Sequence, residues 1–154
     1  MRKMITVKIN GEERQYPQGA TYEDVANDYQ QEYENLIALA ARDGKIRELF
    51  KKLTRDCEIT FFTLKDDVGN KTYVRSATML FLKAVFDVFG RETVQNCRVE
   101  FAIGNGSYIS PKGKINATEE NAAKIRNRMR ELVEAKTPFL KRSYSLDNAM
   151  ELFR

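Results

Sequence analysis

The opening residues MITVKINGEERQY constrain the fold more than any other stretch of the sequence. Ile5, Val7 and Ile9 alternate with polar residues, which is the pattern of a β-strand with one buried face. An Asn-Gly pair at 10–11 separates this run from a second short run, and this arrangement is the strongest short-range signal of a β-hairpin. We therefore expect the chain to begin with two antiparallel strands and not with a signal peptide.

A helix is expected directly after this hairpin. Thr21 is its predicted N-cap, Asp24 is the acidic partner in a capping box, and its buried face is formed by Val25, Ala26 and Tyr29. Two strands around an Asp43-Gly44 turn follow, and a further strand runs from about Glu58 to Thr63. This order of elements predicts a β-grasp (ubiquitin-like) domain, in which a mixed sheet holds one helix on one face.

A long helix is predicted in the middle of the chain. The stretch LKDDVGNKT before it, residues 64–72, is rich in turn-forming residues, so we predict a loop and a domain boundary there. The helix opens with the polar residues Arg75, Ser76 and Thr78, continues with Met79, and ends at Gly90. Further apolar residues on its other side predict packing on more than one side. Its main buried face comprises Val74, Ala77, Phe81, Ala84, Val85 and Val88.

The last third of the chain predicts a second α+β domain. Val99, Phe101 and Ile103 alternate before an Asn105-Gly106 turn and a short return strand, and a loop is expected at 111–114. Thr118 is the expected N-cap of an amphipathic helix. An extended segment at 139–144 and a short helix at 145–154 complete the domain. The apolar stripe of the amphipathic helix comprises Ala122, Ile125, Met129, Leu132 and Val133.

Composition excludes several classes of catalytic site. The chain has no histidine, which removes Ser-His-Asp and Cys-His chemistry and the common catalytic zinc sites. No GxxxxGK[ST] phosphate-binding loop is present. Cys57 and Cys97 form no CxxC pair, and we interpret them as reduced core residues of a cytoplasmic protein. No run approaches the roughly 18 apolar residues of a membrane span.

The net charge of +4 permits RNA binding without requiring it. Residues 1–110 carry 16 basic and 16 acidic side chains, whereas residues 111–154 carry 10 and 6, so the whole excess lies in the last third. Lys124, Arg126, Arg128 and Arg130 form either an RNA-facing surface or a solvated helix face. Because glutamates are interleaved with them, the solvated face is the favoured interpretation.

Four stretches carry a resemblance to threonyl-tRNA synthetases. ITVKINGEERQYPQGATYEDVA resembles their TGS domain, a β-grasp module at the front of these enzymes and of several GTPases. TYVRSATMLFLKAVFDVFG with GNGSYIS, and then TEENAAKIRNRMRELVEAKTPFLKRSYSLDNAMELF, resemble their second additional domain. The resemblance covers nearly the whole chain. It implies a TGS β-grasp domain at 1–64 and an editing-like α+β domain at 66–154.

The resemblance also implies a lost activity. In the synthetases the second additional domain hydrolyses mischarged tRNA with a helix that bears His-x-x-x-His. The matching positions here are Arg75 and Met79, and neither replaces an imidazole as a base near neutral pH. We therefore expect no catalytic residue, no metal and no cofactor in this chain, and no editing.

A more particular resemblance is to bacterial uridine kinase-like proteins. These nucleoside kinases carry a region of this type before a P-loop kinase domain, and the editing histidines are typically replaced in them. The resemblance predicts a C-terminal P-loop kinase domain of the same protein beyond Arg154, an ATP-dependent transferase that requires ATP and Mg. This chain is then a non-catalytic regulatory or ligand-binding module. One alternative is a tRNA-binding module related to the synthetase editing region, with editing activity lost, and another is a plain interaction or oligomerisation module.

Five residues form the predicted ligand site, which would hold a nucleotide or tRNA. Arg75 is expected to bind a phosphate or carboxylate, Ser76 and Thr78 to hydrogen-bond sugar or base groups, and Tyr108 to stack on a ring, with Met79 beside them. The alternatives are structural. Arg75 is then a solvated residue of the first helical turn paired with Asp66 or Asp67, and Met79 fills the core.

Overall fold

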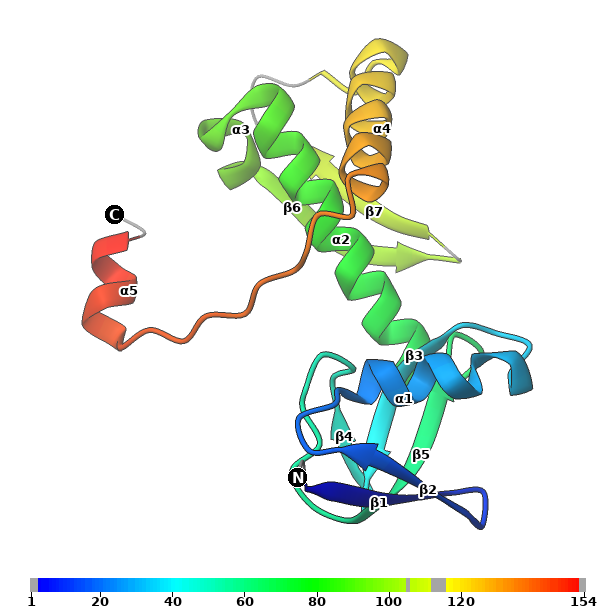
Figure 1. The fold of residues 1–154 in the computed structure, drawn as a ribbon. Helices are drawn as coiled ribbons and strands as arrows, with labels where there is room; N and C mark the ends of the chain where they lie inside the picture. The colour runs from blue at the N-terminus through cyan, green and yellow to red at the C-terminus, as the bar shows by residue number, and fades with distance from the viewer. Residues whose placement is uncertain (1–2, 105, 112–115, 153–154) are drawn as a thin grey trace. The chain divides into compact units, whose positions relative to one another are not determined.

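The computed structural model describes residues 3–104, 106–111 and 116–152, with only the backbone of 102, 103 and 111. The chain divides into two compact units, 1–79 and 80–154, and the division lies inside the long helix α2 (Asp67–Phe89). Figure 1 shows the elements of both units. Each unit is described below by itself.

The first unit is built on a mixed five-stranded sheet. Its order is β2-β1-β5-β3-β4, and only β1 and β5 run parallel among the paired strands. Helix α1 (Tyr22–Tyr29) lies across this sheet (Figure 1) and is followed by the short 3₁₀ helix η1 (Gln30–Glu32). This arrangement is the predicted β-grasp fold, and α+β is confirmed. The strands are β1 (Met4–Ile9), β2 (Glu12–Pro17), β3 (Ile37–Arg42), β4 (Lys45–Arg47) and β5 (Cys57–Thr63).

Both predicted turns of this sheet are confirmed. Asn10 and Gly11 have φ of 52° and 89°, and Asp43 and Gly44 have φ of 49° and 77°. Two successive residues with positive φ give the turn whose twist matches that of the flanking strands. Asn, Asp and Gly are the residues that adopt this conformation at least cost.

The predicted capping box of α1 is also confirmed. The Asp24 backbone N–H donates to the Thr21 hydroxyl at 3.1 Å, and the Thr21 N–H donates to the Asp24 carboxylate at 2.7 Å. The predicted buried face is confirmed as well, and Tyr22 joins it. The core beneath the helix comprises Ile5, Val7, Ile9, Tyr16, Tyr22, Val25, Ala26, Tyr29, Ile37, Ala40, Leu53, Ile59 and Phe61.

The predicted loop at 64–72 is wrong over most of its length, because α2 begins at Asp67. The Thr63 N–H donates to the Asp66 carboxylate at 2.7 Å, and the Asn70 N–H donates to the Asp66 carbonyl at 2.8 Å, which starts the helix. Gly69 is a residue of this helix and not of a turn. Its lack of a side chain permits the close approach of Thr63. The Arg75–Thr78 cluster therefore lies in the third turn of the helix.

Burial along α2 differs from the prediction. Ala84 and Val85 are buried as expected, but Val74 is 43% exposed and Met79 is 59% exposed. The interpretation of Met79 as core filler is therefore wrong. Periodicity shows which side chains share a helix face, but it does not show whether another element covers that face along its whole length.

The second unit contains the C-terminal part of α2, the helices α3 (Arg91–Gln95), α4 (Glu119–Glu134) and α5 (Leu146–Leu152), and the strands β6 (Cys97–Ile103) and β7 (Gly106–Pro111). The two strands form an antiparallel ribbon with a bulge between Val99 and Ala102. The expected end of α2 at Gly90 is confirmed by its φ of 84°. Helix α3 was not predicted. Asn105, residues 112–114 and the last two residues, for which a turn, a loop and helix were predicted, lie outside the described residues.

Helix α4 begins as predicted, since the Asn121 N–H donates to the Thr118 hydroxyl at 3.2 Å. Leu132 is buried and Ile125 and Met129 are half-buried, but Ala122 is exposed and Val133 is 60% exposed, contrary to the predicted stripe. Helix α5 confirms the predicted short helix, and its described side chains include no buried one. No helix within the described residues is long and apolar enough to cross a membrane.

Candidate ligand-binding site

Arg75 and Met79 occupy neighbouring positions on the surface of α2. Residues four apart lie on the same side of a helix, so the two side chains are one turn apart. Arg75 is exposed and makes no ion pair within the described part of the chain. The predicted alternative partners are engaged elsewhere, since Asp67 pairs with Lys71 at 2.6 Å and Asp66 accepts from Thr63. Within the described residues, Arg75 therefore pairs with neither of these two aspartates.

The hydroxyl groups of Ser76 and Thr78 are already used as donors. Ser76 Oγ donates to the Thr72 carbonyl at 3.1 Å, and Thr78 Oγ1 donates to the Val74 carbonyl at 2.9 Å. A hydroxyl has one hydrogen and two lone pairs, so each group can still accept a hydrogen bond from a ligand. This geometry favours recognition of N–H or O–H groups over recognition of carbonyl oxygens.

Tyr108 belongs to the second unit, whereas the other four predicted residues belong to the first. Its ring stacks on Phe101 with ring centroids 5.2 Å apart and an interplanar angle of 24°. Both rings stay about half exposed, at 48% and 58%. The predicted hairpin brings Phe101 and Tyr108 near each other, but their pairing was not predicted. The bulge in β6 shifts the register between Val99 and Ala102, and no signal in the sequence marks that bulge.

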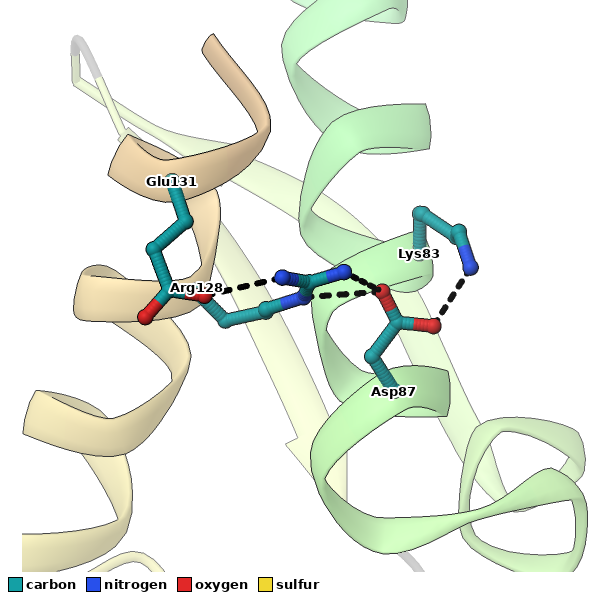
Figure 2. Close-up of polar contacts among 4 residues, drawn as sticks. All are labelled: Lys83, Asp87, Arg128 and Glu131. Atoms are coloured by element: carbon teal, nitrogen blue, oxygen red, sulfur yellow. Dashed lines mark hydrogen bonds and ion pairs between the residues drawn. The ribbon is translucent and has the colours of Figure 1, made fainter. Parts of the chain in front are cut away.

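An ion-pair network joins α2 and α4 within the second unit. Figure 2 shows the Arg128 guanidinium between Asp87 of α2 and Glu131 of its own helix, with Lys83 on the other side of Asp87. Arg128 donates to the Asp87 carboxylate through Nε and Nη2, both at 2.9 Å. Asp87 is exposed as a whole residue, but its side chain keeps only 16% of its surface in solvent. Hydrogen bonds from Lys83, and then from Arg128, lower the pKa of this carboxyl.

The remaining basic residues of α4 are mostly paired too. Lys124 pairs with Glu120 at 2.7 Å and Arg126 with Glu119 at 3.7 Å. These pairs support the interpretation of a solvated helix face. Beside them lies a groove of about 330 Å³, lined by Leu80, Arg126, Met129, Arg130, Val133 and Glu134.

The two cysteines are free and half-buried. Burial raises the pKa of both thiols, which disfavours the reactive thiolate. Among the described residues no group of three or more His, Cys, Asp or Glu side chains is placed to hold a metal ion. The exposed groups of α2 and of the β6–β7 ribbon therefore offer binding chemistry, namely an arginine, hydroxyl acceptors and an aromatic face.

Comparison with curated proteins finds threonine–tRNA ligases among the relatives of this chain. The chain is 28% identical over 155 residues to a threonine–tRNA ligase of Thermotoga neapolitana, covering 99% of the chain. It is 28% identical over 154 residues to the ligase of Thermotoga maritima and 25% identical over 154 residues to that of Symbiobacterium thermophilum. The chain spans only 23% of the length of these relatives. No family model matches the sequence.

These relatives support the resemblance to threonyl-tRNA synthetases and give no support to a uridine kinase-like parent. Identity of 25–28% is spread across 97–99% of the chain and includes both units. Over nearly its whole length, this chain is therefore similar to a segment of threonine–tRNA ligases.

Proposed function

We propose that this chain is a tRNA-binding module related to the editing region of threonyl-tRNA synthetases, with the editing activity lost. The observation that carries the proposal is the similarity to threonine–tRNA ligases along 97–99% of the chain. The exposed Arg75 and the half-exposed pair of Phe101 and Tyr108 are suited to RNA, since arginine binds phosphate and aromatic rings stack on bases.

Loss of editing is supported by the side chains that the sequence lacks. The chain contains no histidine, and Arg75 and Met79 stand at the positions that match His-x-x-x-His. A methionine thioether transfers no proton, and an arginine stays protonated at physiological pH, so neither group can act as the general base. The kinase domain, with its ATP and Mg, remains a prediction from resemblance. Sequencing the coding region downstream of residue 154 tests it.

Binding is tested by titrating a fluorescently labelled tRNA for threonine with the purified chain and following anisotropy. We expect binding that weakens steeply between about 50 and 200 mM salt, because neutralised phosphates release counterions. A tRNA for another amino acid measures specificity. Absence of binding at the lowest salt concentration would contradict the proposed function.

Editing is tested with mischarged threonine tRNA and the same protein. We expect no release of the amino acid above the spontaneous rate, with or without added zinc. An editing-competent threonyl-tRNA synthetase serves as the positive control. Zinc-dependent hydrolysis by this chain would show that the editing activity persists without histidine.

A further inference from the structure

The segment KIRELFKK, residues 45–52, concentrates positive charge on the first unit. It carries four basic side chains, Lys45, Arg47, Lys51 and Lys52, and one acidic side chain, Glu48. Its first part is β4, one of the two edge strands of the sheet. The net charge of residues 1–110 is zero, so the net charge alone does not show this local excess of basic side chains.

In the folded protein this segment runs from β4 to the N-terminal end of α1. Lys45 and Arg47 lie two residues apart on β4 and so share a face of the sheet, with Lys45 opposite Arg42. Farther along, the Tyr22 N–H donates to the Lys51 carbonyl at 2.9 Å, and Lys52 forms a β-bridge with Thr21. The start of α1 therefore anchors the second half of the segment.

Both halves of the segment, β4 and residues 51–52, interact with Tyr22. Burial raises the pKa of Tyr22, and the positive charges of Arg42 and Arg47 oppose that shift. Arg42 and Arg47 thus act on the hydroxyl end of Tyr22, and the backbone of the same residue binds Lys51. We call Arg42, Lys45, Arg47, Lys51 and Lys52 the basic surface, because backbone pairing joins Lys45 to Arg42 and joins Lys51 and Lys52 to the start of α1.

These side chains differ in their partners from several other basic residues on helices α2 and α4. Lys71, Lys124 and Arg128 each pair with a carboxylate. Within the described residues none of Lys45, Arg47, Lys51 and Lys52 forms such a pair, while the nearby Arg55 pairs with Asp43 at 3.0 Å. Lys51 lies over the ring of Phe50, 5.8 Å from its centroid, and that ring is 51% exposed.

We propose that this basic surface binds consecutive phosphates of an RNA strand, with Phe50 as an apolar contact for a base or ribose. The proposal rests on the proposed function and names the surface that holds the RNA. Lysines on an edge strand also prevent pairing with other sheets. That role does not account for Lys51 and Lys52, which lie beyond the end of β4.

The test compares two pairs of substitutions in the full chain. Lys45→Gln with Lys52→Gln removes two charges of the basic surface that have no carboxylate partner among the described residues. Lys124→Gln with Arg126→Gln removes two paired charges of α4. If both surface lysines contact phosphates, the first variant reduces the salt slope of log K by between about 1.4 and 1.8, and the control leaves it unchanged. Circular dichroism and urea unfolding of both variants serve as controls for correct folding.

A third variant should bind RNA more tightly than the wild type. Glu23 stands beside this surface, since its N–H donates to the Leu49 carbonyl at 2.8 Å. Glu23→Gln removes a negative charge and should strengthen RNA binding, most clearly at low salt. Such a gain is not expected if the lysines serve only to protect the sheet edge.

The outcomes separate the two proposals. Wild-type protein that binds no RNA contradicts the proposed function. Wild-type protein that binds RNA, with equal affinity and salt slope for the Lys45/Lys52 variant, contradicts only the assignment of this surface. Titrations with ATP and inorganic phosphate complete the test. Binding of either one that is lost in the Lys45/Lys52 variant, with RNA binding retained, would assign the surface to a small phosphate ligand instead.

Discussion

The backbone of α2 passes so close to the end of β5 that Gly69 has no space for a side chain. A Cβ built there would lie 2.0 Å from the Thr63 carbonyl oxygen, which is backbone and cannot turn aside. The sequence predicted a turn from Gly69-Asn70, and glycine is indeed required, but for a different reason. A contact between residues six positions apart, at the start of a helix, leaves no trace in local propensity.

Gly69→Ala tests this contact by the sign of its effect. In an open helix interior, alanine is more favourable than glycine by about 0.5–1 kcal/mol. Here the clash should dominate and lower the free energy of unfolding by about 1–3 kcal/mol, measured by urea denaturation. Asn70→Ala, an exposed neighbour in the same helix, is the control and should be neutral or slightly stabilising. A Gly69→Ala protein that is more stable than wild type would contradict the predicted clash.

Two aspartates share one motif, in which a threonine three residues earlier donates both its N–H and its hydroxyl. Asp24 accepts from Thr21 at 2.7 and 2.8 Å, and Asp66 accepts from Thr63 at 2.7 and 2.9 Å. The backbone hydrogen bond is the main cause that lowers the pKa of each carboxyl below its ordinary value of 3.8, and the hydroxyl adds to it.

Because folding lowers these pKa values, the carboxylates stabilise the folded state above the unfolded pKa near 3.8. The contribution is lost as the pH falls through the lower folded pKa. We therefore expect stability to decrease as the pH falls below about 4. Urea unfolding at a series of pH values should show a weaker dependence in Asp24→Asn and Asp66→Asn. An unchanged pH dependence in both variants would show that the carboxylates titrate alike in both states.

At the scale of the elements, the features that depend only on neighbouring residues were predicted from the sequence. Both turns of the first sheet and the N-caps at Thr21 and Thr118 needed only neighbouring residues, and all four were predicted correctly. The start of α2, the helix α3 and the bulge in β6 were not predicted. Each depends on contacts or on register between strands, which no short window contains.

The pairing of α2 with α4 is an element-scale contact open to a double-mutant cycle. Asp87→Ala and Arg128→Ala, singly and together, should show a favourable coupling between the two side chains, measured by urea unfolding. The same cycle on the more exposed pair Glu120 and Lys124 is the control, and its coupling should be smaller. Equal couplings would mean that the partial burial of Asp87 adds nothing to the pair.

At the scale of the molecule, the buried core is concentrated in one unit. All residues of the main cluster lie between Ile5 and Phe61, whereas the buried side chains described in the second unit are Ala84, Val85 and Leu132. Burial of apolar surface is the main stabilising contribution to folding. The first unit should therefore be the more stable of the two.

A fragment of residues 1–79 tests this expectation. We expect it to fold cooperatively, with dispersed amide resonances and a sharp urea transition, because its core is complete without the rest of the chain. A fragment of residues 80–154 should unfold at lower urea concentration. A disordered 1–79 fragment would show that its core depends on the second unit.

The β-grasp unit, its turns and caps, and the absence of imidazole side chains could all be read from the sequence, because alternation, turn residues and composition need no knowledge of tertiary contacts. It also predicted the ligand residues of α2 and Tyr108, which still await a test. Four features became visible only in the folded chain: Gly69 lies against Thr63, Met79 is exposed, Phe101 stacks on Tyr108, and the backbone of residues 51–52 pairs with the start of α1. Those features arise from segments that meet only when the chain folds.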